Sequence, residues 1–221
     1  TAASLARLSA PDADPAEFPA NARFALATLP ALTTRPDQIK PLRQTILNLA
    51  VRGKLVPQDA GDEPASELLK RIAAEKARLV KTGEIRKPKA LPPVEDGPFD
   101  LPSNWRWVRI REVTSDRRQR IPDGDFTYID VTAINKEAGV VAEPNVLSKD
   151  EAPSRARKIA SRGDVLYSCV RPYLLNVAVL DRDFDPPPIA STAFAVLNGH
   201  GLVLPWYLWI ALRSPFMVEC V

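Results

Sequence analysis

Two short clusters of basic residues carry the most suggestive chemistry in this sequence. Arg117, Arg118 and Arg120 stand within four residues of one another, beside Gln119. The second cluster precedes Gly163 and consists of Arg155, Arg157, Lys158 and Arg162. Grouped cations suit contacts with nucleic-acid phosphates, because each cation placed against a phosphate releases counterions. Solvated loops without a partner would show the same pattern, so the clusters favour a DNA contact only modestly.

A few side chains in and near these clusters could also read bases. Arginine can donate to O6 and N7 of guanine in the major groove, and Asn or Gln can read adenine. The candidate readers are therefore Arg118, Gln119, Arg120 and Asn135. Arg171 stands in a Val-Arg-Pro-Tyr stretch that ends at Tyr173, beside a bend that proline fixes. We expect Arg171 either to face DNA, with Tyr173, or to pin the bend by pairing with a carboxylate.

Catalytic chemistry finds little support. The stretch 185–188 is Asp-Pro-Pro-Pro and lacks the aromatic residue with which amino-methyltransferases stack a flipped base. Neither a glycine-rich cofactor loop nor a Gly-Lys-Ser/Thr phosphate loop is present. Asp130 is followed two residues later by Thr132, where a metal-dependent nuclease would need lysine. The single histidine, His200, is predicted to be a surface loop residue, so we expect a chain without catalytic activity.

Composition allows a nucleic-acid partner without requiring one. The 221 residues are 45% hydrophobic, enough for a real core, and the formal net charge is +3. Cys169 and Cys220 have neither metal-ligand spacing nor a disulfide framework, and we expect both to be small buried residues in a reducing cytosol. No apolar run reaches the roughly 18 residues of a membrane span. These features predict a cytoplasmic protein that does not contact a membrane.

The first half of the chain divides into three segments. Residues 1–35 are rich in Ala and Pro and are expected to form a poorly ordered arm. Residues 36–83 hold two predicted helices, one from Pro36 to Gly53 and one that Asp62 would cap and that ends at Gly83. The second has charged faces and a narrow apolar stripe, as coiled-coil helices do. Residues 84–100 contain four prolines and read as a linker between domains.

Residues 101–221 read as a mostly β domain with one packed helix. Short runs rich in Val, Ile, Tyr and Phe predict strands at 105–110, 127–134, 139–142, 165–170, 175–180 and 190–197. A helix is predicted to begin at Pro205, and Gly163 is expected to free a backbone turn. The fold class is therefore α+β, with an N-terminal helical region.

Several motifs, taken in order, resemble one family. They are LRQTILNLAVRGKLVPQD, DEPASELLKRIAAEKARL, LPSNWRWVRI, YIDVTAI, EAPSRARKIASRGDVLYSCVRPYL and IASTAFAVL. Together they resemble the DNA sequence-specificity subunits of type I restriction–modification systems. The resemblance implies a subunit that reads double-stranded DNA, performs no chemistry and directs methyltransferase and restriction subunits to a target in host defence. Such a complex uses S-adenosylmethionine, ATP and Mg, none of which this chain is expected to bind.

The resemblance also implies an architecture. The helices would be part of a spacer that docks methyltransferase subunits, and the domain after residue 101 would read half of a split target. Apolar residues of the spacer are the expected partner contacts: Leu42, Ile46, Leu49, Leu69, Ile72 and Leu79. Some motif residues are expected to build the recognition fold rather than to read bases: Gly163, Asp164, Arg171, Pro172, Ser191 and Thr192.

One departure from the family pattern leaves alternatives open. Full members have two helical regions and two recognition domains, whereas this chain has one helical region and one domain that looks incomplete. It could be a fragment, a half-subunit that dimerises with itself, or a truncated product. In the last case it would dock a methyltransferase without reading DNA.

Overall fold

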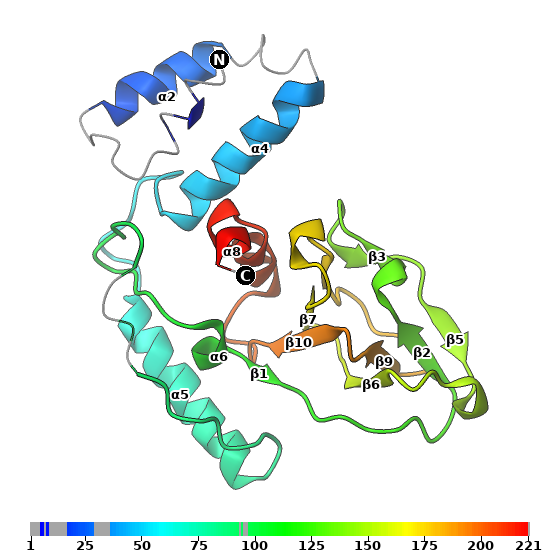
Figure 1. The fold of residues 1–221 in the computed structure, drawn as a ribbon. Coiled ribbons are helices and arrows are strands. Elements are labelled where there is room, and N and C mark those ends of the chain that lie inside the picture. Colours follow the sequence, from blue (N-terminus) through cyan, green and yellow to red (C-terminus); the bar gives the residue numbers. More distant parts are fainter. Residues whose placement is uncertain are drawn as a thin grey trace.

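The computed structural model describes residues 5, 6, 8, 17–28, 36–92, 94 and 97–220. It contains helices together with two mixed β-sheets, which confirms the α+β class (Figure 1). The helices are α2 (Phe18–Ala27), α4 (Pro36–Val51), α5 (Ala65–Lys81), α6 (Ile110–Val113), α7 (Pro205–Leu212) and α8 (Pro215–Glu219). Three short 3-10 turns are η1 (Val131–Ala133), η2 (Lys149–Glu151) and η3 (Pro172–Leu174).

The strands form a six-stranded and a four-stranded sheet. The first has the order β1-β10-β7-β8-β4-β3 and the second β5-β2-β9-β6. The strands of the first sheet are β1 (Ser115–Asp116), β3 (Ile134–Asn135), β4 (Val140–Val141), β7 (Val165–Ser168), β8 (Val177–Val179) and β10 (Phe194–Asn198). Those of the second are β2 (Phe126–Ile129), β5 (Asn145–Leu147), β6 (Ala156–Ile159) and β9 (Pro188–Ser191).

The six-stranded sheet is buried on both faces. Leu166 and Ala178 point to a core shared with Ile129 and Ala190 of the four-stranded sheet. Their neighbours in β7 and β8 point the other way, to a second core with α7 and α5. This core is made by Val165, Val177, Val179, Leu208, Leu212 and Ile72. Burial on both faces explains why β7 and β8 read as nearly continuous apolar runs.

The strand predicted at 105–110 is wrong. Residues 105–109 are not in a strand, and Ile110–Val113 form the helical turn α6. The aromatic side chains of this stretch pack among helices: the ring of Trp107 lies 4.7 Å from that of Phe99 and 5.3 Å from that of Phe216 in α8. Trp105 donates its indole N–H to Gln58 (2.9 Å). Alternating aromatic residues imitate a strand, but here Trp107 packs against Phe216 of α8 and Trp105 is hydrogen-bonded to Gln58.

The two long helices lie where the sequence predicts them, although α5 begins after Pro64 rather than at Asp62. The helix α4 packs against α7 and α8, and α5 packs against α6. Lys76 of α5 is 8% exposed, and its ammonium donates to the carbonyls of Arg111 (2.6 Å), Glu112 (3.2 Å) and Thr114 (2.8 Å). These bonds cap carbonyl groups of α6 and hold α5 against the β domain. The apolar stripe of α5, predicted to be a coiled-coil seam, packs within the chain, because Ile72 lies in the core with β7 and β8.

Other expectations need correction. The arm predicted to be poorly ordered contains α2, and the rest of it lies largely outside the described residues. Cys169 and Cys220 are both exposed, because one follows the last residue of β7 and the other follows α8. The run 127–134 is broken into β2, η1 and β3, and the run 190–197 is divided between β9 and β10. Gly163 adopts φ +87°, which confirms the predicted glycine turn.

The proline-rich segment does not extend away from α5. Residues 84–92, which we call the strap, run back along this helix (Figure 1). The backbone N–H groups of Glu84 (2.9 Å) and Ile85 (3.3 Å) donate to the carbonyl of Leu79, and the guanidinium of Arg109 donates to that of Pro92. Both ends of the strap are therefore attached to the rest of the chain. In the part of the chain that the structure describes, no helix is long and apolar enough to cross a bilayer.

Candidate nucleic-acid interface

Parts of the two basic clusters of the sequence lie side by side in the structure. The segment after β1 runs antiparallel to β6: the N–H of Arg120 donates to the carbonyl of Arg157 (2.9 Å), and that of Ile159 to the carbonyl of Arg118 (3.3 Å). Gln119 and Lys158 are the bridged pair between these bonds. The segment thus adds to the edge of the four-stranded sheet. We call Arg118, Gln119, Arg120 and Arg157 the basic edge.

Strand geometry orients the basic edge. Side chains on either side of a bridged pair point to the face opposite to it. Arg118, Arg120 and Arg157 therefore share one face, and Gln119 and Lys158 the other. Arg118 and Arg120 are exposed, and the guanidinium of Arg120 lies 3.9 Å from the carboxylate of Asp123, a surface pair that contributes little to stability. The guanidinium groups of Arg118 and Arg120 can contact phosphates or base edges without breaking a buried interaction, whereas that of the half-buried Arg157 donates to the carbonyl of Ala156 (2.7 Å).

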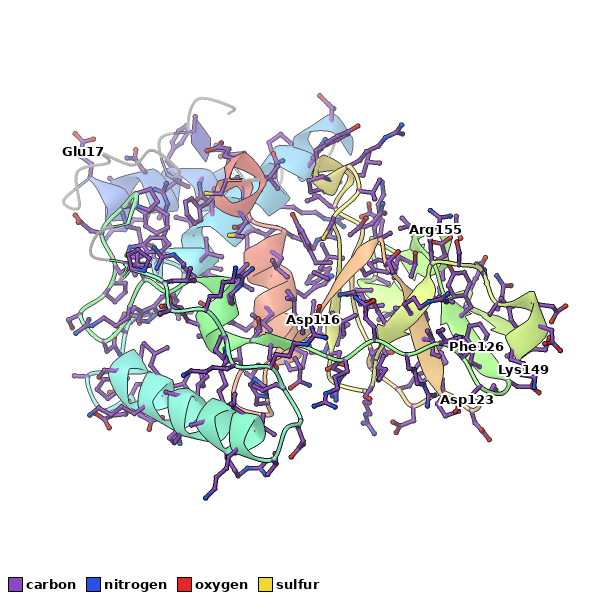
Figure 2. The ribbon with its side chains drawn as sticks, turned by 60° about the horizontal axis from the view of Figure 1, so that its bottom comes forward. Glu17, Asp116, Asp123, Phe126, Lys149 and Arg155 are labelled. Atoms are coloured by element: carbon purple, nitrogen blue, oxygen red, sulfur yellow. The ribbon has the colours of Figure 1, made fainter. Side chains whose placement is uncertain are left out.

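Two of the predicted DNA-binding cations have structural partners instead. Arg117 donates through Nε to Asp164 (2.5 Å), a fully buried carboxylate that also accepts from Asn198 (2.6 Å) and from the N–H of Ser161 (2.8 Å). Lys158 pairs with Asp116 (2.5 Å), and its side chain is only 12% exposed. Asp116 lies near the centre of the view in Figure 2. These pairs fix the segment that carries the basic edge, and they leave Arg117 and Lys158 less available to DNA.

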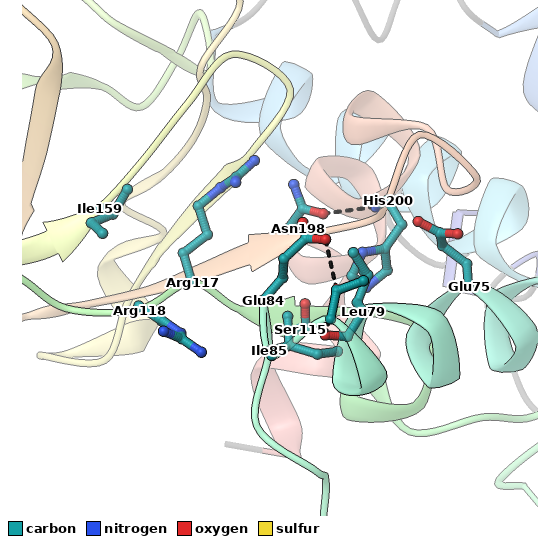
Figure 3. A pocket seen from close by; sticks show the side chains of 12 residues that line it. Glu75, Leu79, Glu84, Ile85, Ser115, Arg117, Arg118, Ile159, Asn198 and His200 are labelled. Carbon is teal, nitrogen blue, oxygen red and sulfur yellow. Dashed lines mark hydrogen bonds between the residues drawn. The ribbon is translucent and has the colours of Figure 1, made fainter.

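A pocket of about 580 Å³ adjoins this segment (Figure 3). Glu75 and Leu79 of α5 line it on one side, and Arg117, Arg118 and His200 on the others. His200 is half-buried in a left-handed turn (φ 57°), so the prediction of a surface residue is wrong in this respect. Burial lowers the pKa of its imidazole below the ordinary value, and the nearby Lys76 lowers this pKa further.

The remaining candidates occupy different places in the structure. Asn135 accepts through its side-chain oxygen from the N–H groups of Glu137 (3.1 Å) and Ala138 (3.0 Å), so it caps the turn between β3 and β4. Arg155 is near Asp130 at the end of β2 (4.0 Å), away from Asp116 (Figure 2). Arg162 is exposed and lies 3.6 Å from Asp183. Arg162 shares a small pocket with Arg120, which places it beside the basic edge.

Arg171 and Tyr173 belong to a separate feature, the loop between β7 and β8. Arg171 and Leu175 both adopt left-handed conformations (φ 50° and 57°), which disfavour side chains other than glycine. Val170 and Tyr173 are 55% and 65% exposed. Among the described residues no carboxylate pairs with Arg171, so nothing in this part of the chain supports the carboxylate alternative. We call residues 169–175 the hairpin loop.

The predicted partner contacts divide by burial. Ile72, Leu49 and Leu79 are 1%, 8% and 8% exposed, and Ile72 is in the core with β7 and β8. These three stabilise the chain itself and are not open to a partner. Ile46 is 43% exposed, and Leu42 and Leu69 are half-buried, so these remain predicted contacts.

Four basic residues were missed in the sequence. Arg86, Lys87 and Lys89 of the strap, with Arg111 of α6, line a groove of about 830 Å³ whose lining also includes Arg118 and Gln119. We call it the basic groove. The strap cations stand in a proline-rich stretch, which is typical of a solvated linker. Only the return of the strap along α5 brings them to the basic edge. Among the described residues, no group of three or more His, Cys, Asp or Glu side chains could hold a metal ion.

Comparison with curated proteins finds two specificity subunits of Escherichia coli. The chain is 36% identical over 201 residues to the type I restriction enzyme EcoAI specificity subunit, covering 86% of this chain and 34% of that protein. It is 60% identical over 84 residues to the EcoEI specificity subunit, covering 37% of this chain and 14% of that protein. The chain thus spans about a third or less of the length of the curated relatives it matches. No family model matches it.

Solved structures give the same relationship. The HsdS subunit of Thermoanaerobacter tengcongensis is 36% identical and superposes with a TM-score of 0.50, covering 56% of this chain and 33% of that one. A chain from a structural study of complex assembly and conformational transition in the type I R-M system is 37% identical, with a TM-score of 0.51 and coverage of 55% and 32%.

Proposed function

Since the chain belongs to the type I restriction–modification specificity subunits, of which it spans about a third, we propose that it is a DNA-reading part of such a subunit. It recognises one part of a target in double-stranded DNA and directs methyltransferase and restriction subunits to it. The chain itself performs no chemistry. This role belongs to the cytoplasm, where the DNA and these partners are.

The observation that best supports this proposal is the basic edge. Arg118, Arg120 and Arg157 share one face where the segment after β1 pairs with β6, and the Arg117–Asp164 and Lys158–Asp116 pairs hold this segment in place. Arginine reads guanine directly, through O6 and N7 in the major groove. A rigid backbone that presents these arginine side chains together suits base recognition, because a reader must keep its donors in a fixed geometry.

The test is to map where DNA is methylated. This chain, co-expressed with its cognate methyltransferase subunit, is given a random-sequence duplex pool, and methyl-adenine positions are located at base resolution. We expect a short, reproducible motif whose symmetry reports whether two copies of the chain act together. A folded complex that methylates without any sequence preference would refute the proposal.

A second candidate function is methyltransferase docking without DNA reading. One observation favours it: an apolar groove of about 820 Å³ lies between α5 and the strap. Leu69, Ala73 and Val80 line one side, and Leu91 and Trp107 the other. Under this alternative the chain still co-purifies with the methyltransferase subunit, whereas no salt-dependent binding to duplex DNA is detected.

A further inference from the structure

The basic groove gathers several cations that pair with no carboxylate among the described residues. Seven of its lining residues are cations, and Asp116 is the acidic one. Lys76 donates to backbone carbonyl groups and Arg117 pairs with Asp164, so five cations without such partners remain. These are Arg86, Lys87, Lys89, Arg111 and Arg118, and none forms an ion pair within the described residues. Asp116 already pairs with Lys158.

Three of these cations, Arg86, Lys87 and Lys89, lie close together on the strap. Pro88 lies between Lys87 and Lys89, and proline fixes the backbone and favours an extended chain. The five residues 85–89 can span at most roughly 17 Å when extended. One DNA strand presents a phosphate about every 3.4 Å along the helix axis, so a segment of this length can face more than one phosphate.

The groove is also continuous with the basic edge. Arg118 and Gln119 line the groove and also belong to the basic edge. All three strap cations and Arg111 are exposed, so no buried contact must break before a polyanion can enter. A single small phosphate would neutralise only part of this charge, whereas a nucleic-acid backbone would meet all of it.

We infer that the basic groove binds the phosphate backbone of duplex DNA flanking the bases that the basic edge reads. This inference rests on the proposed function and extends it: the strap is a DNA-contacting element rather than a passive connection. Because the strap packs along α5, contact between the strap and the DNA phosphates would also fix the orientation of this helix relative to the DNA. Phosphate contacts of this kind set register and add affinity without reading sequence.

The test compares two triple variants of the chain in its complex with the methyltransferase subunit. R86A/K87A/K89A removes the strap cations, and K40A/K136A/K149A removes three exposed cations outside the groove as a charge-matched control. Duplex affinity is measured from low to physiological salt, together with the methylated motif. We expect the slope of log affinity against log salt to fall by roughly two to three for the strap variant, since each lost phosphate contact removes about 0.9. The motif stays unchanged, and the control keeps a steeper slope.

The outcomes separate this inference from the proposed function. An unchanged slope with an unchanged motif overturns the inference and leaves the proposed function intact. Loss of methyltransferase co-purification with an unchanged slope makes the groove a protein-docking surface and also overturns it. If the unmodified complex shows neither a motif nor salt-dependent binding, the proposed function itself fails. The variant R86K/K87R/K89R changes the same three positions but retains their cations, so it should keep the unmodified slope if the loss of charge causes the effect.

Discussion

The basic edge and the hairpin loop lie at opposite ends of β7 and present different chemistry. The basic edge follows Arg117, whose partner Asp164 directly precedes β7, whereas Arg171 and Tyr173 follow the end of β7. The four residues of β7, roughly 13 Å of extended strand, lie between Asp164 and the start of the hairpin loop. At the edge, exposed guanidinium groups lie on an unstrained strand pairing. At the loop, one exposed arginine stands among apolar residues on a strained backbone.

The difference suggests two roles within one domain. A charged surface without strain can adapt to phosphates, while a strained loop persists only where its surroundings hold it. Hydrogen bonds do so here, including those from Leu174 to Arg171 (2.9 Å) and from Leu175 to Pro172 (2.9 Å). We expect the basic edge to carry DNA affinity, and the hairpin loop to contribute shape through Tyr173.

The largest expected effect is on stability beneath the basic edge. Asp164→Ala removes the fully buried partner of Arg117 and Asn198. Breaking a buried pair costs roughly 3–5 kcal/mol, and we expect the lower end because Arg117 is 34% exposed. Urea unfolding measures the loss. Asp183→Ala breaks an exposed pair with Arg162 and should cost less than about 1 kcal/mol, so equal losses in the two variants would contradict the structural role of Asp164.

The second effect is on DNA affinity. The double variant R120A/R157A should lower duplex affinity at physiological salt and reduce the salt slope by roughly two if both groups contact phosphates. If either group reads a base, the methylated motif should also relax at one position, at a cost of about 1–3 kcal/mol. Binding at several salt concentrations and motif mapping distinguish these outcomes. Full affinity with the original motif would move DNA binding away from the basic edge.

The hairpin loop should respond in the opposite sense. Arg171→Gly relieves a left-handed conformation and is expected to stabilise the chain by roughly 0.5–1 kcal/mol, since part of the gain is offset by a more flexible unfolded state. Leu175→Gly should behave similarly while keeping the arginine. If DNA affinity falls in the Arg171 variant only, the guanidinium contacts DNA. A loss of stability in both variants would contradict the strain seen in the loop.

The smallest effect is a pH dependence near the basic edge. His200 has a lowered pKa because of burial first, then the nearby Lys76, and Arg117 acts in the same direction, whereas Glu75 and Asp164 oppose it. The unfolded chain then binds more protons than the folded chain just below pH 6.5, so stability is full above that pH and falls as the pH is lowered. His200→Asn should flatten this fall in thermal unfolding between pH 7 and 5. The same slope in both proteins would assign it to other groups.

Much of the local structure could be predicted from spacing and turn residues. The apolar spacing of Ile39, Leu42, Ile46 and Leu49 predicts α4, and Pro205 marks the start of α7. Gly163 marks the turn before β7. The strand predicted at 105–110 is absent, because Trp107 packs against Phe216 of α8 instead of lying in a sheet. In the N-terminal arm, α2 was not predicted. Periodicity reports which side of a segment is apolar, but it does not report what that side will meet.

The sequence by itself determined the fold class, the family, and the residue types able to contact DNA, because motifs and local propensities are written along the chain. Only the tertiary structure decided which of those residues act together. It paired 118–120 with β6 across almost forty positions of sequence, committed Arg117 to Asp164, and brought the strap cations to Arg118. These outcomes depend on strand pairing and on burial between distant segments, and neither is encoded by the spacing of neighbouring residues.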